Sequence, residues 1–219
     1  MDSFSMKDVV FVSVAFGFEY LKQMDRLQKS ILSIYPEANL LFFDNGLPNG
    51  SKPFLDSLYG FKPHAIQEAR NQGYKKVIWL DPAMILTDKV DDLINQKTVI
   101  AVRDDSKLYN VVSDKCYAYF GLDAHYVAFK NWHLVGGSLY FFNFDRPMDN
   151  IILDTWLTAE KHGIFGSQHE AASEQLQGHR YDEAVLALTM YTNGVEPVGA
   201  DQVRYCISEN PMFIKKHFK

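Results

Sequence analysis

Residues 75–83 read Lys75-Lys76-Val77-Ile78-Trp79-Leu80-Asp81-Pro82-Ala83, an apolar run that ends at one carboxylate followed by a proline. A run of this kind is typical of a buried strand in a parallel sheet. The strand would deliver Asp81 to the carboxyl-end edge of the sheet, where open α/β folds bind ligands. A carboxylate buried there needs a partner, such as a metal ion, a ribose hydroxyl or a basic side chain. The alternative is structural, because Asp-Pro also favours the start of a turn.

Strand and helix patterns alternate on both sides of this segment. The residues that precede it predict a β-branched strand (9–15), a helix whose apolar residues recur at steps of three and four (19–35), a short strand (40–43) and a helix that ends at Gly73 (62–73). After it come a short helix (88–93) and a strand (98–102) that finishes at Arg103-Asp104-Asp105. The alternation predicts an α/β fold with a mostly parallel central sheet flanked by helices.

The second half of the chain has a different pattern. Residues 106–134 are rich in aromatics without a clean period, and residues 163–178 and 195–219 are predicted to be loop or irregular. A strand is expected over 139–144, after a double glycine, with helices over 150–162 and 181–191. A length of 219 residues suits a single domain.

The composition and charge of the chain disfavour some classes of binding partner and cellular location. A net charge of -5 without a block of lysines or arginines disfavours nucleic acid as a partner. Cys116 and Cys206 show no metal-type spacing and are expected to be reduced thiols of a cytoplasmic protein. The sequence shows no signal-peptide pattern and no apolar run of about 20 residues, so no membrane span is expected.

Two further segments could face a ligand at the ends of strands. At the end of the first strand, Val14-Ala15-Phe16-Gly17 has small residues that would let a nucleotide base approach, and Phe16 or Tyr20 could cover its ring. Gly136-Gly137 could likewise admit a ligand to the backbone. The structural alternatives are an ordinary strand-to-helix turn and a tight bend.

A third segment, His179-Arg180-Tyr181-Asp182-Glu183, begins the last predicted helix. Arg180 could meet phosphate charge, and Asp182 could act as a base or bind a hydroxyl. The alternative is again structural, because acidic residues stabilise helix N-termini.

Taken in order, five of these elements resemble nucleotide-sugar glycosyltransferases of the GT-A fold. They are the N-terminal strand, the Lys62-Pro63 helix, the Trp79-Leu80-Asp81 strand end, the Gly136-Gly137 strand and the Asp182-Glu183 helix. The likeness spans residues 9 to about 195 and is strongest to small bacterial and large-DNA-virus enzymes. It implies one glycosyltransferase domain, with a nucleotide-binding half (1–105) and an acceptor-side half (106–219). A viral enzyme would work in the host cytoplasm.

The resemblance also implies a role for each matched residue. Asp81 matches the first carboxylate of the Asp-x-Asp motif, which contacts the ribose and a divalent metal. Lys62 matches a cation that faces the donor, and Asp182 an acidic residue near the anomeric carbon. Ala15 and Gly17 match the base-binding strand end, and Gly136 and Gly137 match the glycine turn beside the transferred sugar. Val14, Phe16 and Tyr20 are expected to contact the nucleotide beside that strand end, and Arg180 is expected near phosphate.

The motif departs from the family at its third position, where Ala83 replaces the second carboxylate. A hard cation such as Mn²⁺ or Mg²⁺ prefers several oxygen ligands, so Asp81 alone would supply too few protein ligands. Asp88, Asp182 and His217 are the candidates for a further ligand, and metal-independent transfer is the alternative.

The resemblance therefore implies a hexosyltransferase that moves a sugar from a nucleoside-diphosphate donor, by preference a UDP-sugar such as UDP-glucose, to a glycan acceptor. Asp182 would be the general base if the enzyme inverts configuration, and it would orient the donor if the enzyme retains it. Two alternatives stay open. One is a sugar nucleotidyltransferase, for which the expected glycine-rich basic loop is missing after the first strand. The other is a nucleotide- or glycan-binding module without catalysis, which Ala83 favours.

Overall fold

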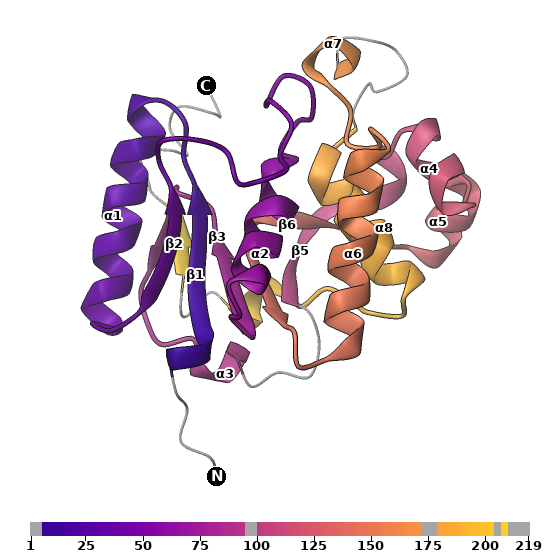
Figure 1. The fold of residues 1–219 in the computed structure, drawn as a ribbon. Coiled ribbons are helices and arrows are strands. Elements are labelled where there is room, and N and C mark those ends of the chain that lie inside the picture. The colour runs from indigo at the N-terminus through magenta and orange to yellow at the C-terminus, as the bar shows by residue number, and fades with distance from the viewer. Residues whose placement is uncertain (1–5, 95–99, 172–178, 204–206, 210–219) are drawn as a thin grey trace.

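A five-stranded sheet with helices on both faces forms the centre of the molecule (Figure 1). The structure is a computed structural model, and it describes residues 6–94, 100–171, 179–203 and 207–209. The strand order is β2-β1-β3-β6-β5, in which β1 pairs in parallel with β2 and β3, while β6 runs antiparallel to both of its neighbours. Four of the five strands therefore point the same way. The predicted fold class, a single α/β domain with a mostly parallel sheet, is confirmed.

The first half of the chain follows the predicted alternation closely. Its elements are β1 (Val9–Val14), α1 (Phe18–Ile34), β2 (Asn39–Phe43), α2 (Phe61–Asn71) and β3 (Lys76–Leu80). Pro36 follows the end of α1, and Gly73 follows α2 with a φ of 91°, a torsion that glycine adopts without strain. These signals are local, which is why the sequence predicted the elements to within about two residues.

Side chains of the central strands alternate between two cores. In β1, Val9 and Phe11 pack toward α1, whereas Val10, Val12 and Val14 pack toward α2, α6 and α8 on the opposite face. The same period of two continues through β3 and β6. Both faces of the sheet are therefore covered, and ligands can reach it only at its edges and strand ends.

Two glycines lie inside a long strand of the second half, which corrects the predicted boundary. β6 (His133–Asn143) is antiparallel to β3 from Leu80↔Leu139 to Lys76↔Asn143, and Gly136 and Gly137 belong to the same strand rather than preceding it. β5 (Ile100–Lys107) also runs past the predicted stop at Asp105, with register shifts against β6. Charged residues such as Asp104 and Asp105 favour a strand end locally, but long-range pairing with β6 continues the strand through them.

The segment without clean period, 106–134, contains two short helices, α4 (Asp114–Phe120) and α5 (Ala124–Lys130). Ser113 and Asp123 cap them by accepting hydrogen bonds from the amides of Cys116 and Tyr126. Gly121 and Asn131 end them in the left-handed conformation. Each helix is too short for a period to show in the sequence.

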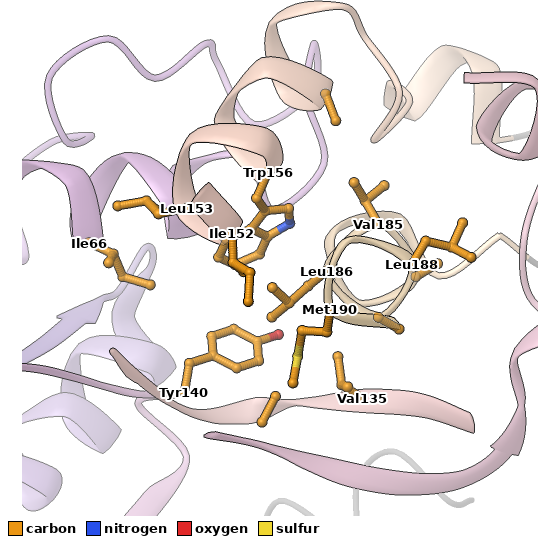
Figure 2. Packing of buried hydrophobic residues seen from close by; sticks show 14 of the residues in the cluster. Ile66, Val135, Tyr140, Ile152, Leu153, Trp156, Val185, Leu186, Leu188 and Met190 are labelled. Atoms are coloured by element: carbon orange, nitrogen blue, oxygen red, sulfur yellow. The ribbon is translucent and has the colours of Figure 1, made fainter. Parts of the chain in front are cut away.

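The larger core lies between the sheet and helices α6 (Pro147–Lys161) and α8 (Tyr181–Thr192). Figure 2 shows Trp156 of α6, Tyr140 of β6 and Leu186 of α8 meeting there. The indole N–H of Trp156 donates to the carbonyl of Asp182 at 3.1 Å, so the first turn of α8 is fixed to α6.

The remaining elements are small. In the described ranges they are β4 (Met84–Leu86), which pairs antiparallel with β7 (Ile207–Glu209), the short helices α3 (Asp91–Ile94) and α7 (Gln168–Ala171), and 3₁₀ turns at Met6–Asp8, Leu108–Asn110 and Ala200–Gln202. Among the helices in the described ranges, none combines the length and apolarity that crossing a bilayer requires.

Candidate functional site

Three charged groups of residues and one glycine meet where β3 ends. Asp81 follows β3, Lys62 lies in the first turn of α2, Gly137 lies in β6, and Asp182 and Glu183 lie in the first turn of α8. The structure thus brings together residues that the sequence placed at separate strand ends and helix starts. We call Lys62, Asp81, Asp182 and Glu183 the charged cluster.

Asp81 performs the turn role that its sequence suggested, and one of its oxygens is sufficient for it. Its Oδ1 accepts a hydrogen bond from the amide of Ala83 at 2.9 Å, and its own amide donates to Ser138 at 2.9 Å. Burial raises the pKa of the Asp81 carboxyl, while Lys62 opposes that rise. The turn role and a ligand role are compatible, because the turn uses Oδ1 alone.

Lys62 and Asp182 form a buried ion pair, with 2.8 Å between Nζ and Oδ2. The Lys62 ammonium also donates to the carbonyl of Gly137 at 3.4 Å, and the hydroxyl of Tyr140 lies 3.4 Å from Asp182 Oδ2. Burial lowers the pKa of Lys62, but the charges of Asp182, Glu183 and Asp81 outweigh burial and raise it above its ordinary value. Lys62 is therefore held as a cation beneath the site.

Asp182 is placed more deeply than its neighbour Glu183. The Asp182 side chain is 3% exposed, whereas that of Glu183 is 15% exposed. Burial raises the pKa of the Asp182 carboxyl, an effect that Lys62 counteracts. Glu183 accepts from Arg180 through Oε2, at 3.1 Å from Nε and 2.8 Å from a terminal nitrogen, and Arg180 lies outermost. The cluster therefore has a covered carboxylate, Asp182, and two carboxylates nearer to solvent, Asp81 and Glu183.

The two neighbouring glycines of β6 are not equivalent. A Cβ at Gly137 would lie 2.6 Å from Lys62 Nζ and 2.6 Å from Glu183 Oε1, but the nearest atom to a Cβ at Gly136 would be the Val102 carbonyl oxygen, at 3.9 Å. A side chain at Gly137 would therefore displace Lys62 Nζ and Glu183 Oε1 from their positions over the strand. No such displacement would occur at Gly136.

The end of β1 lies at the same edge of the sheet. Val14 and Ala15 are buried, and the Ala15 amide donates to the carbonyl of Phe43 at 3.0 Å. Phe16 is 38% exposed and rests edge-on against Phe61, at 5.4 Å between ring centroids. Gly17 has a φ of 79° and open space around its missing side chain, so its glycine is needed for conformation rather than for room.

Tyr20, in the first turn of α1, connects the β1 end to the charged cluster. Its pKa is raised by burial and by the negative charge of Asp81. The Tyr20 hydroxyl therefore lies within electrostatic range of Asp81.

Three aromatic residues of the site were missed by sequence reasoning. Tyr59, Trp79 and Tyr140 place their rings 5.1, 5.9 and 5.7 Å from the Lys62 ammonium. Trp79 also donates its indole N–H to the Gly137 carbonyl at 3.1 Å. The tyrosine hydroxyl within the apolar run of β6 was a usable signal for Tyr140, since a buried hydroxyl needs a partner, but nothing local indicated Tyr59.

His179 is a structural residue. Its Nδ1 accepts from the Ser113 amide at 3.3 Å, and its Nε2 lies 3.2 Å from the Ile164 carbonyl, so the ring is neutral with the proton on Nε2. Burial lowers its pKa to about 4. The histidine fixes the segment before α8 and thereby the position of the acidic first turn.

The protein ligands for a divalent metal are incomplete in the described residues. Within these ranges no three His, Cys, Asp or Glu side chains come together as a metal site would require. Asp182 already pairs with Lys62 and Glu183 with Arg180, while Asp88 is exposed and accepts from the Lys89 amide at 2.7 Å. His217 lies outside the described residues. Asp81 alone does not fit a hard cation, and divalent-metal dependence stays a prediction.

Comparison with solved structures finds glycosyltransferases. WbbM, a bifunctional glycosyltransferase, superposes with a TM-score of 0.52 at 13% identity, over 88% of this chain and 39% of that one. GlyE of Streptococcus pneumoniae gives 0.49 at 13% identity, over 90% and 46% of the two chains. A glycosyltransferase involved in glycosylation of the major capsid of PBCV-1 gives 0.43 at 13% identity, over 78% of each chain.

The chain spans less than half the length of WbbM and of GlyE. No protein-family model and no curated protein sequence matches it. At this identity the WbbM likeness is evidence of fold, and it agrees with the strand order and the helix layers described above. The chain therefore has a GT-A-like fold, the fold that the sequence resemblance implied.

Proposed function

We propose that the protein is a glycosyltransferase that moves a sugar from a nucleoside-diphosphate donor, a UDP-sugar, to a glycan acceptor. The observation that carries the proposal is the charged cluster, because residues from β3, α2 and α8 converge at the edge of a GT-A-like sheet beside the β1 end. Paired carboxylates with a held cation suit chemistry in which negative charge develops on a leaving group. The identities of the acceptor, the transferred sugar and the nucleotide are part of what we propose.

In the proposed reaction, the bond between the anomeric carbon and the diphosphate oxygen breaks, and its electron pair leaves with the diphosphate. The acceptor hydroxyl oxygen bonds to the anomeric carbon, and its proton goes to a carboxylate of the cluster. Asp81 would hold the donor ribose, and Arg180, with its exposed guanidinium, would meet the diphosphate. Phe16 and Tyr20 would cover the uracil ring beside Ala15 and Gly17.

Asp182 is proposed as the base of an inverting reaction or, in a retaining one, as a group that orients the donor. Its raised pKa suits a group that must exchange protons near neutrality. Lys62 would hold the Asp182 carboxylate in place and supply positive charge to the site. No step is assigned to a metal.

A nucleotide-binding module without catalysis is the second candidate. Ala83 at the motif position and the covered, ion-paired carboxylate of Asp182 favour it. A sugar nucleotidyltransferase is not favoured, because only three residues, 15–17, separate β1 from α1 and leave no room for a basic glycine-rich loop.

The direct test is incubation with UDP-glucose and related UDP-sugars, followed by measurement of released UDP. We expect slow hydrolysis in the wild type and loss of most of it in Asp81→Asn, which keeps an acceptor oxygen for the Ala83 amide and therefore preserves the turn. Near-normal turnover in the variant would leave Asp81 with its turn role only. Saturable UDP binding without any turnover would favour the module.

A thermal-shift panel completes the test. A ligand that binds only the folded state raises the melting temperature by mass action. UDP should raise it more than GDP, CDP or ADP, and each nucleotide is measured with Mn²⁺ and with a chelator. Equal shifts for all nucleotides would contradict the donor assignment, and a UDP shift that survives chelation would establish donor binding without a metal.

A further inference from the structure

Two tyrosines beside the charged cluster have left-handed backbone torsions. Tyr59 has a φ of 60° and Tyr181 a φ of 39°. Across the described ranges, the other non-glycine residue with positive φ is Asn131, which ends α5 as its C-cap. For a bulky residue such a torsion is unfavourable, and it persists only where the surrounding structure fixes it.

The two rings meet although they come from different segments. Tyr59 precedes α2 and Tyr181 begins α8, and their ring centroids lie 6.0 Å apart with 33° between the planes. We call them the tyrosine pair. The Tyr59 ring lies 5.1 Å from the Lys62 ammonium, and burial together with the charge of Asp182 raises the pKa of its hydroxyl. The tyrosine pair therefore adjoins the carboxylates.

Polar contacts to the buried side chain of Glu160 hold the loop that carries Tyr59. Glu160 of α6 lies 3.1 Å from His64 Nε2 through one oxygen and 3.3 Å from Lys52 Nζ through the other. The Leu58 amide donates to the carbonyl of Gly166 at 3.0 Å. These contacts fix both flanks of Tyr59, so its ring is held in place before any ligand arrives.

Tyr59 also leaves part of its ring uncovered. The residue is 38% exposed, and its ring rests at 90° against Phe54, with 5.3 Å between centroids. Tyr181 is partly buried. A partly exposed aromatic surface beside carboxylates can meet both the apolar C–H face and the hydroxyls of a sugar ring.

The tyrosine pair extends from the proposed base site toward α8. The Tyr59 ring lies 6.2 Å from that of Phe61, which in turn contacts Phe16. Tyr181, on the other side of the pair, belongs to α8. The β1 end, with Phe16 and Tyr20, is the proposed place of the nucleotide base. In the sheet, β3 separates β1 from β6, and α8, which carries Tyr181, packs on β6. We propose that the tyrosine pair binds a sugar ring of the glycan acceptor. This inference rests on the proposed glycosyl transfer and names the acceptor subsite of the same site.

The test measures binding of simple sugars and of UDP separately. The sugar probes are the methyl glycosides of glucose, galactose, mannose and xylose, and their binding is followed by saturation-transfer NMR, with UDP binding measured by calorimetry. The variants are Tyr59→Ala, Tyr181→Ala and the two Phe replacements. Tyr126→Ala is the matched control, because Tyr126 is 42% exposed on α5 and lies outside the tyrosine pair.

We expect at least one glycoside to bind the wild type, and each Ala variant to weaken it about tenfold. The Phe variants and Tyr126→Ala should bind it as the wild type does, and UDP affinity should be unchanged throughout. If Tyr59→Ala does not fold, Tyr59→Gly replaces it, since glycine removes the ring and accepts the left-handed torsion.

Three results would overturn the inference. They are glycoside binding that survives both ring deletions, loss of UDP binding in place of glycoside binding, and no glycoside bound by the wild type at up to about 50 mM. A wrong donor assignment would give a result that differs from these three. If the wild type binds no UDP but binds a glycoside through the tyrosine pair, the donor assignment fails and the sugar site stands.

Discussion

Lys62 Nζ and Asp182 Oδ2 lie 2.8 Å apart in the interior, although 120 positions separate the two residues in the chain. Their side chains are 4% and 3% exposed, so neither charge has water to solvate it. The pair joins the start of α2 to the start of α8 across the end of the sheet. Each charge therefore depends on the other for its stabilisation.

Replacing Lys62 with Met should destabilise the protein by about 3–5 kcal/mol, because it leaves the Asp182 carboxylate buried without a cation. The double variant Lys62→Met, Asp182→Asn should recover a substantial part of that loss, since the remaining amide is neutral. Urea unfolding of the two single variants and the double variant measures the coupling. A Lys62→Met variant as stable as the wild type would show that the pair is not formed.

Asp182→Asn and Glu183→Gln separate the covered carboxylate from the one nearer to solvent. If Asp182 is the base or the donor-orienting group, its Asn variant should fold, bind UDP and lose on the order of 100-fold in turnover. Asn is also a good helix N-terminal residue, but it removes the charge partner of Lys62, so the variant should be less stable than the wild type while remaining folded. Turnover is measured at saturating donor. Loss in Glu183→Gln with wild-type rates in Asp182→Asn would transfer the role to Glu183.

Gly137→Ala and Gly136→Ala form a matched pair. At Gly137 the new methyl group would meet Lys62 Nζ and Glu183 Oε1, which lie at the ends of long side chains and must move aside. We expect Gly137→Ala to lose on the order of 10- to 100-fold in activity, because displaced charges no longer match the substrate. Its melting temperature should also fall, because moving Lys62 disturbs the buried pair with Asp182.

Gly136→Ala meets nothing closer than 3.9 Å and should behave like the wild type. The comparison uses donor turnover and thermal denaturation on the same preparations. Equal activity in the two variants would mean that the positions of Lys62 Nζ and Glu183 Oε1 beside Gly137 do not matter for function.

His179 should make the protein sensitive to acid. The unfolded chain takes up a proton near the ordinary histidine pKa of about 6.5, whereas the folded protein refuses it until about pH 4. The stabilising contribution is therefore complete above pH 6.5 and is lost as the pH falls toward 4. The difference in pKa corresponds to roughly 3 kcal/mol in the free energy of unfolding.

The measurement is urea unfolding at several values of pH between 7 and 4 for the wild type and His179→Asn. The variant should be less stable at neutral pH, because the contacts to Ser113 and Ile164 are changed. Its stability should then decline less steeply as the pH falls. Parallel declines in the two proteins would assign the acid sensitivity to other groups.

Local signals were sufficient for the first half of the fold. The apolar run that ends at Asp81, the three-four period of α1 and the stops at Pro36 and Gly73 each depend on near neighbours in the chain, so the sequence shows them directly. Boundaries in the second half were less accurate. β5 continues through Asp104 and Asp105, and β6 includes the two glycines, because pairing between distant strands sets those limits.

The residue types of the site could also be predicted, but not their relation to one another. Asp81, Lys62, Gly137 and Asp182 were each identified from a strand end, a helix start or a double glycine. Only the fold decided how these residues meet. It pairs Lys62 with Asp182 and brings Tyr59 against Tyr181. It also leaves room for a side chain at Gly136 but not at Gly137. A sequence reports the hydrogen bonds and torsions open to nearby residues, whereas contacts between distant segments are fixed only when the sheet and its covering helices pack together.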